Sequence, residues 1–507
     1  MAARAKNAYL ASLSLDPGDK QPLHRQLFMA LREAILDGRI KPGIRLPSSR
    51  IMAEDLSVSR NTVLTAFDQL TAEGYITSKI GAGSYVSDQL PDDFLKRKKK
   101  ERETLTHPPE RHIQLSKMAQ KISKGSRHLN YQGKHFSPGI PELDQFPFED
   151  WARLLGKHWR RPKKEYLIGN PVGGAAVLRE ALADHLGQTR AVRCTPEQVI
   201  VLSGSQQAIH LVIKAFAEVG DNIWMEEPGY PGIRNSILYA GANPVSVPVD
   251  DEGFRLDLAK KMAPDARLAA VSPSHQYPLG QTMSLRRRLD LLQWAKEENR
   301  FILEDDYDSE YRYTGRPLSS LQGLDTDNRV LYIGTLSKVM FPGLRIGYLV
   351  VPPDLVETFL ALRKEVDGHS PAAAEAALAE FISEGYLAAH IRRVRLLYQK
   401  RQETLVRLLK EKAADSLDVT PQESGMHVVA YLKGSLDDKE VEKKAREAGL
   451  LVRSLSGFYQ NPTAQNGLIL GFAATKEEEM PQLVDKLAHI LQEQSDFINK
   501  ETHHVGT

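Results

Sequence analysis

The sequence TLSKVMFPGLRIGY, at residues 335–348, decides how most of this 507-residue chain is interpreted. It follows residues 330–333, a short apolar run typical of a buried strand. A Ser-Lys pair is common and by itself indicates nothing beyond an exposed lysine. Here, however, Lys338 lies between a buried strand and a Pro-Gly turn, and Arg345 follows seven residues later. This combination makes Lys338 the first candidate for a chemically active side chain.

Short apolar segments alternate with helical patterns from about residue 131 onward. This βα rhythm predicts an α/β domain whose sheet is buried on both faces. Ligand sites in such sheets lie at the carboxyl ends of the strands, which is where the polar candidates fall. The predicted strands cover residues 199–202, 222–225, 268–271, 301–303 and 330–333.

Polar segments follow four of these strands. SGSQQA at 203–208 leads into a helix, and free amides at a helix N-terminus form a cradle for an anion such as phosphate. The other three segments are EEPGY at 226–230, SPSHQYPLG at 272–280 and EDDY at 304–307. Taken with Lys338, the carboxylates at 304–306 indicate a functional site rather than an exposed acidic turn.

The lysine segment and the segments before it resemble the fold-type I, aspartate-aminotransferase-like proteins. The resemblance implies a mixed, mostly parallel sheet with a smaller second lobe. It also implies that pyridoxal 5'-phosphate forms an imine with Lys338, the catalytic residue, while Arg345 holds the cofactor phosphate. A carboxylate at the pyridine nitrogen keeps the ring protonated, and the resemblance places that role on Asp305, with Asp306 as the alternative. Tyr307 is implied as a hydroxyl donor near the ring oxygen.

The same resemblance implies further cofactor contacts. The turn at 203–208 corresponds to the phosphate-binding turn, and an aromatic residue after the next strand stacks on the pyridine ring. At 272–280 an Asn-Pro-x-Gly motif is expected, but Tyr277 replaces the asparagine, which leaves the ring-oxygen contact to His275, Gln276 or Tyr307. The additional candidates are Ser203, Ser205 and Gln206 for the phosphate, Tyr230 for stacking and His275 for the ring oxygen.

A second departure concerns the ligand. Many aminotransferases carry an arginine just before a C-terminal apolar strand, where it grips the substrate carboxylate. Here that segment reads GLILGFA at 467–473, without an arginine. Arg453 lies nearby in the sequence and is the candidate effector-binding residue, with a surface arginine as the alternative interpretation.

The N-terminal region has a different pattern. Apolar residues recur at helical spacing between Pro22 and Gly38, a second short helix begins near Ser48 or Ser49, and Ser59 caps a third. Residues 75–77 and 84–86 alternate like strands around a glycine-rich turn. This order resembles the winged helix-turn-helix of GntR-type regulators.

A recognition helix places its N-terminal residues against base edges, while hydroxyls and amides hold phosphates. The candidates cluster at the starts of the second and third helices, and one lysine lies on the predicted wing. These DNA-binding candidates are Arg45, Ser49, Arg50, Ser59, Arg60, Asn61, Thr62 and Lys79.

Three segments follow from these patterns: a winged helix-turn-helix at 18–88, a basic linker at 89–130 and the aminotransferase-like domain at 131–500. Residues 91–128 carry 11 lysine or arginine residues against five acidic ones, so the basic excess lies next to the predicted DNA-binding domain. A solvated tether is the plainer interpretation of this run.

Composition excludes other classes of protein. No apolar run approaches the roughly 20 residues of a membrane span, so no membrane partner is expected. The N-terminus lacks the apolar core of a secretory signal. A single cysteine, Cys194, excludes an intrachain disulfide and a cysteine-built metal site, and we predict no metal centre. A cytoplasmic location is expected.

Across nearly its whole length the chain resembles the MocR subfamily of GntR-type regulators. Two further segments carry this resemblance, HQYPLG at 275–280 and EDDYDSEYRY at 304–313. It implies a homodimer that binds operator DNA and senses a small amine, an amino acid or the cofactor itself. The alternative is an active aminotransferase with an appended DNA-binding domain, and residual transamination stays chemically possible under either interpretation.

Overall fold

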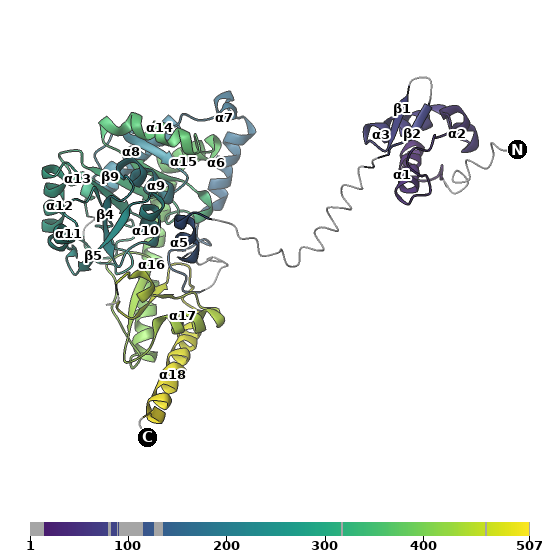
Figure 1. Cartoon of the computed structure of the whole chain (residues 1–507). Coiled ribbons are helices and arrows are strands. Elements are labelled where there is room, and N and C mark those ends of the chain that lie inside the picture. Colours follow the sequence, from purple (N-terminus) through teal and green to yellow (C-terminus); the bar gives the residue numbers. More distant parts are fainter. Residues whose placement is uncertain are drawn as a thin grey trace. The chain divides into compact units, whose positions relative to one another are not determined.

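The structure is a computed structural model that describes residues 15–79, 83–88, 90, 115–125, 135–315, 318–461 and 464–505. The chain forms two compact units, Met1–Gln114 and Leu115–Thr507, which are described separately (Figure 1). Most of the predicted linker at 89–130 lies outside the described residues, as does the side chain of Lys79. Within the described part of the chain, no helix is both long and apolar enough to cross a membrane.

The described residues of the smaller unit form three helices and a hairpin. Ser48 caps the second helix by accepting a bond from the Ile51 amide, and Ser59 caps the third by accepting one from Thr62. Its elements are α1 (Leu23–Leu36), α2 (Ser49–Asp55), α3 (Arg60–Ala72), β1 (Ile76–Lys79) and β2 (Gly83–Val86), with β1 antiparallel to β2.

Helical spacing explains the core of this unit. Leu27, Leu31 and Ile35 recur on one face of α1 and are at most 1% exposed. Side chains from α2, α3 and the hairpin complete the cluster, among them Met52, Val63, Phe67, Leu70, Ile76 and Val86. The predicted winged helix-turn-helix architecture is therefore present.

An eight-stranded sheet organises the larger unit. Its order is β3-β10-β9-β8-β7-β4-β5-β6. The central strands are parallel, whereas β10 runs antiparallel to both neighbours and β6 runs antiparallel to β5. The strands are β3 (Val199–Leu202), β4 (Asn222–Glu227), β5 (Asn243–Asp250), β6 (Gly253–Phe254), β7 (Leu268–Val271), β8 (Phe301–Asp306), β9 (Val330–Thr335) and β10 (Gly347–Val350).

Both faces of this sheet are buried. Successive residues of a strand point to opposite faces, and in β3 Val199 and Val201 join one core cluster while Ile200 and Leu202 join another. Helices cover the two faces (Figure 1). The helices of this part of the chain are α6 (Phe148–Arg160), α7 (Lys164–Ile168), α8 (Ala176–Arg190), α9 (Ser205–Phe216), α10 (Pro231–Tyr239), α11 (Leu256–Met262), α12 (Leu285–Glu297), α13 (Leu321–Leu324), α14 (Val356–Val366) and α15 (Ala372–Ser383), of which α6 and α7 pack on α15.

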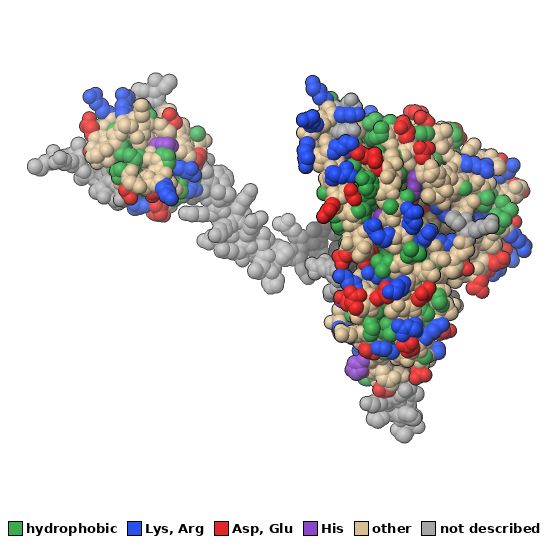
Figure 2. Space-filling view, turned by 180° about the vertical axis from the view of Figure 1, so that it is seen from behind, with side chains coloured by type: hydrophobic (Ala, Val, Ile, Leu, Met, Phe, Trp, Pro, Cys, Tyr) green, Lys and Arg blue, Asp and Glu red, His purple; other side chains and the backbone are tan. Residues whose placement is uncertain are grey.

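A smaller lobe completes the larger unit. Four antiparallel strands in the order β11-β12-β14-β13 pack with helices, as the fold-type I resemblance predicts. The elements are α16 (Tyr386–Lys412), β11 (Leu417–Val419), β12 (His427–Leu432), α17 (Asp438–Glu447), β13 (Arg453–Ser454), β14 (Gly467–Gly471) and α18 (Met480–Val505), with α5 (Lys117–Gly125) preceding this unit's sheet. On the face of the larger unit seen in Figure 2, basic and acidic side chains are interspersed.

The segment that begins at His135 is bound to the smaller lobe. His135 forms a bridge with Leu450. The Phe136 amide donates to Thr475 Oγ1 at 3.1 Å, and the Gly471 amide donates to the Phe136 carbonyl at 2.9 Å. The first described residues after the linker are therefore fixed beside the cavity described next.

Candidate functional site

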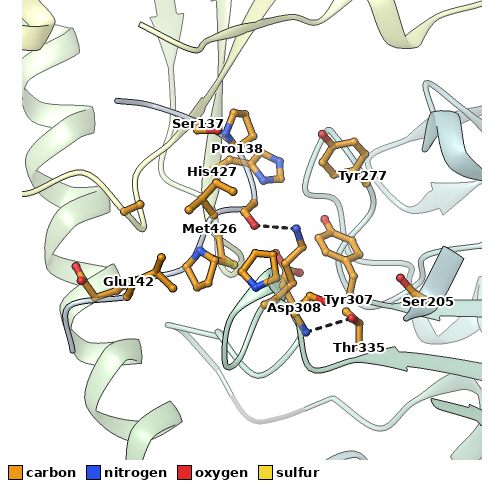
Figure 3. Close-up of a pocket in the computed structure, with 18 of the residues that line it drawn as sticks. Ser137, Pro138, Glu142, Ser205, Tyr277, Tyr307, Asp308, Thr335, Met426 and His427 are labelled. Atoms are coloured by element: carbon orange, nitrogen blue, oxygen red, sulfur yellow. Dashed lines mark hydrogen bonds between the residues drawn. The ribbon is translucent and has the colours of Figure 1, made fainter. Parts of the chain in front are cut away.

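A cavity of about 800 Å³ lies where the carboxyl ends of the central strands meet the smaller lobe. Figure 3 shows Tyr277, Tyr307 and Ser205 on one side of it and Ser137, Pro138 and Met426 on the other. Among its lining residues are seven of the predicted cofactor residues, Ser205, Gln206, Tyr230, Asp305, Tyr307, Lys338 and Arg345. The structure thus brings most of the sequence candidates to one place.

Lys338 lies just beyond the end of β9. Its Nζ donates to the Gly139 carbonyl at 2.8 Å, and Tyr311 Oη donates to the Lys338 carbonyl at 3.0 Å. Burial lowers the pKa of the Lys338 amine, against the opposing influence of Asp308 and Asp305. A lysine with a lowered pKa has more of the neutral, nucleophilic amine at neutral pH.

The two adjacent acids at the end of β8 point to opposite faces. Asp305 lines the cavity. Asp306 instead accepts bonds from Arg190 Nε at 2.8 Å and from Tyr332 Oη at 2.7 Å. Burial raises the pKa of Asp305 to about 7, so its carboxylate would favour a cationic partner in the cavity. Strand alternation therefore leaves Asp305 as the carboxylate that can meet a cofactor ring.

Tyr307 lines the cavity, and its hydroxyl lies next to a buried pair formed by His275 and Asp308. His275 Nδ1 lies 2.8 Å from Asp308 Oδ1 and 3.0 Å from Tyr307 Oη. His275 is 2% exposed and is not among the residues that line the cavity, and its contact with a cofactor ring stays a prediction. Its ring is held behind Tyr307 because Asp308 binds it there.

The start of α9 has the features of a cradle for an anion. Gly204 is the N-cap with φ +110°, and no side chain caps this helix. Arg345 Nη2 donates to the Ser203 carbonyl at 3.0 Å, which places the guanidinium beside the free amides. A Cβ at Gly204 would lie 3.3 Å from Arg345 Nη2, so the glycine keeps this approach open.

Gln206 and Tyr230 are joined beside this anion cradle. Tyr230 Oη donates to Gln206 Oε1 at 3.3 Å, and Gln206 Nε2 donates to Ser236 Oγ at 2.9 Å. Ser203, by contrast, does not line the cavity, because its hydroxyl donates to Asp367 Oδ2 at 3.0 Å. The predicted role of the Ser203 hydroxyl at the phosphate stays a prediction, and its bond to Asp367 does not favour it.

The expected effector arginine is also elsewhere. Arg453 belongs to β13 of the smaller lobe and lies 3.3 Å from Glu442 Oε1. It does not line the cavity, because its side chain is turned toward α17. The assignment of Arg453 as an effector-binding residue stays a prediction, and the ion pair with Glu442 does not favour it.

Sequence reasoning missed several lining residues. Asp308 lies three residues after Asp305, within a stretch already singled out, and the acidic pattern could have found it. The segment 137–144 and His427 come from distant parts of the chain and carry no motif that points to the cavity. Only tertiary packing brings them to Lys338.

The smaller unit presents the predicted DNA contacts at the starts of α2 and α3. Arg50, Arg60 and Asn61 are exposed, and Arg60 Nε donates to Ser49 Oγ at 3.3 Å, which joins the two helix starts. The exposed Arg45 pairs with Tyr85 of β2 and so lies against the hairpin.

Ser59 and Thr62 are tied to each other at the start of α3. Ser59 Oγ accepts from the Thr62 amide and lies 2.9 Å from Thr62 Oγ1. The cap thereby orders the first turn of the helix whose N-terminal residues are expected to meet DNA.

Comparisons with known proteins agree with both units. Residues 23–86 match the model of bacterial regulatory proteins of the gntR family, and residues 136–487 match the aminotransferase class I and II model. The chain is 41% identical to the probable rhizopine catabolism regulatory protein MocR of Rhizobium meliloti, over 94% of this chain and 95% of that protein. The chain belongs to the MocR subfamily of GntR-type regulators.

Other matches agree with this membership. The chain is 30% identical to the pyridoxine biosynthesis transcriptional regulator PdxR of Corynebacterium glutamicum, over 96% of this chain and 98% of that one. Among solved structures, the α-aminoadipate aminotransferase LysN of Thermus thermophilus matches with a TM-score of 0.66 and 27% identity, over 76% of this chain and 96% of LysN.

This MocR-type chain is therefore a transcriptional regulator that joins a DNA-binding GntR domain to an aminotransferase-like domain. The predictions of family, fold and regulatory class are confirmed. An aminotransferase class I and II fold implies binding of pyridoxal phosphate. The donor set fits that group, since an amine, a carboxylate and an uncapped helix start with an arginine face one cavity.

Proposed function

We propose that this MocR-type regulator binds operator DNA as a homodimer and senses a small amine, an amino acid or pyridoxal phosphate itself at Lys338. One observation carries the proposal. Lys338, Asp305, Tyr307 and Arg345 face a single cavity in a chain that also has a GntR domain. A cytoplasmic location is part of the proposal, because the regulator must meet its operator.

Each predicted cofactor residue has a role in the proposal. Lys338 would bind the cofactor covalently, and Arg345 with the α9 amides would hold its phosphate. Asp305 would keep the ring nitrogen protonated, and Tyr230 would pack on the ring. When bound, pyridoxal phosphate supplies a carbonyl that reacts reversibly with amines and a ring that withdraws electrons.

The pair behind Tyr307 determines where its phenol proton can go. Asp308 lies 2.8 Å from His275 Nδ1, which favours a proton on that nitrogen, donated to the carboxylate. A protonated Nδ1 cannot accept a bond from Tyr307, although Tyr307 Oη lies 3.0 Å away. The phenol proton is then free to be donated into the cavity, toward a ring oxygen. Burial raises the pKa of Tyr307 well above its ordinary value, which keeps that proton in place.

The contact between Lys338 and Gly139 supports a route from the ligand to the DNA-binding domain. Gly139 belongs to the described segment from His135 onward, which follows the predicted linker at 89–130 in the sequence. A ligand that changes the partners of Lys338 would also change how this segment is held. We propose that the two arrangements of the segment favour different placements of the DNA-binding domains.

At the DNA, Arg50, Arg60 and Asn61 would read base edges. Ser49 and Thr62 would position the helix starts, with Arg45 and Lys79 at the wing. A dimer would present two such surfaces to two half-sites.

The relatives favour no single ligand. The R. meliloti protein is named for rhizopine catabolism and the C. glutamicum protein for pyridoxine biosynthesis. A cofactor sensor and an amine sensor are therefore both consistent with this family. An active aminotransferase is the remaining alternative, and steady formation of a keto product would favour it.

The test compares wild type with Lys338→Ala. Pyridoxal phosphate is expected to give wild type, and not the variant, a visible absorption band that survives removal of free cofactor. Operator affinity is measured with the cofactor alone and again with added amines and amino acids. If saturating cofactor and every amine leave operator affinity and DNA bending unchanged, the sensing proposal is wrong.

A further inference from the structure

The charged groups that line the cavity are predominantly acidic. Among the described residues that line it, five carry carboxylates and three carry an amine or guanidinium. The carboxylates belong to Glu142, Asp144, Asp305, Asp308 and Glu479, and the cations to Lys338, Arg345 and Lys476. Arg401 neutralises Glu142 and Lys476 neutralises Asp144, which leaves Asp305, Asp308 and Glu479 against Lys338 and Arg345. A ligand that enters this site therefore meets more negative than positive charge, which favours a cationic ligand.

Each of the three cations has an expected role or a partner, and neither lysine can bind a carboxylate through the paired bonds of an arginine. Lys338 is the amine expected to hold the cofactor. Arg345 lies at the anion cradle, with Nη2 3.0 Å from the Ser203 carbonyl beside the start of α9. Lys476 Nζ is paired with Asp144 Oδ2 at 2.9 Å, and the hydrogen bond to Lys476 lowers the pKa of that carboxyl.

Other guanidiniums near the site are bound elsewhere. Arg190 pairs with Asp306 at 2.8 Å and Arg401 with Glu142 at 2.6 Å, and neither lines the cavity. Arg453 is turned toward Glu442. Every residue of β14, where an arginine for a substrate carboxylate would stand, is buried, and Ile469 packs against Leu279.

We infer that the ligand of this cavity is a primary amine without a carboxylate. The inference rests on the proposed function and narrows its ligand class. A carboxylate normally binds an arginine through two parallel hydrogen bonds, and the described residues of this cavity offer no such partner. The acidic lining attracts the protonated amine and repels an added carboxylate.

The experiment uses the full chain loaded with pyridoxal phosphate and pairs of probes that differ by one carboxylate. The pairs are ethanolamine with L-serine and cadaverine with L-lysine. The midpoint of thermal unfolding and the operator affinity are measured as functions of probe concentration. At least one carboxylate-free probe is expected to act at a concentration about tenfold or more below that of its amino acid. A carboxylate without a partner in the cavity loses its charged hydrogen bonds to water, and one such bond corresponds to about tenfold in affinity.

Two variants test the role of charge directly. Asp144→Asn removes the partner of Lys476 and is expected to strengthen the response to the amino acids several-fold. Lys476→Ala is the matched control and should leave the response to ethanolamine and cadaverine within about twofold, because the exposed pair contributes little. If Lys476→Ala abolishes a response to L-serine or L-lysine in a chain that had one, Lys476 grips the carboxylate and the inference is overturned.

The outcomes separate this inference from the proposed function. An amino acid that acts as well as or better than its decarboxylated partner overturns the inference but leaves amine sensing intact. If no amine or amino acid changes either measurement while the cofactor alone does, amine sensing and the inference both fail and a cofactor sensor remains.

Discussion

Replacing Asp305 and Asp306, one at a time, with asparagine should separate cofactor binding from stability. The two acids are adjacent, yet Asp305 lines the cavity while Asp306 pairs with Arg190 on the other face of the sheet. The side chains of Arg190 and Asp306 are 5% and 2% exposed, so the pair is well shielded from water.

The magnitudes follow from these surroundings. Asp306→Asn leaves the buried Arg190 guanidinium without its paired carboxylate, although its bonds to Ser274 and the Leu318 carbonyl remain. Breaking such a pair costs about 3–5 kcal/mol of unfolding free energy. An asparagine oxygen can still accept one bond, so the lower end is expected. Asp305→Asn removes a charged hydrogen bond to a cationic ring, about 1.5–3 kcal/mol, or roughly 10- to 150-fold in the dissociation constant of the cofactor.

The assay measures denaturant unfolding of the cofactor-free larger unit and cofactor affinity by equilibrium dialysis. Asp305→Asn should keep or slightly increase stability, because the wild-type carboxyl is buried at a raised pKa of about 7. Asp306→Asn should lose stability and keep most of its cofactor affinity. If Asp306→Asn instead weakens cofactor binding as strongly as Asp305→Asn at unchanged stability, the assignment from strand alternation is refuted.

Three further predictions follow. Burial raises the pKa of Asp305 from 3.8 to about 7, so the unfolded chain loses this proton at a lower pH than the folded chain does. The unfolding free energy of the cofactor-free protein should therefore fall as the pH rises from about 4 to 7. Asp305→Asn should make this dependence on pH less steep in unfolding titrations, and an unchanged dependence would contradict the burial of the Asp305 carboxyl. Gly139→Val places a Cβ 2.5 Å from Lys338 Nζ at a φ of +75°, so cofactor should be incorporated more weakly, whereas Gly434→Ala, also at positive φ but in open space, serves as the strain control. Arg60→Ala should weaken operator binding by about 1–3 kcal/mol in a gel-shift titration, against Arg39→Ala as an exposed control off the recognition helix, and equal losses in the two would argue against base reading.

The sequence determined the chemistry of this protein because its decisive residues are local in the chain. The lysine segment at 335–348, the turn at 203–208 and the acids at 304–307 each follow an apolar strand, and a parallel sheet brings strand ends together. The DNA-binding helices were likewise readable, since caps such as Ser59 and the spacing of Leu27 and Leu31 are short-range signals.

Tertiary structure decided what each side chain faces. Strand alternation turned Asp305 into the cavity and Asp306 away from it, a difference that adjacent acids do not reveal in sequence. The side chains of Ser203, His275 and Arg453 are bound by Asp367, Asp308 and Glu442, and none of the three lines the cavity.

The contact from Lys338 to Gly139 spans 199 residues, and no local pattern encodes a contact at that separation. Such contacts depend on how the two lobes pack. The sequence therefore determined which chemistry this protein can perform, and the fold decided which of the candidate residues are placed to perform it.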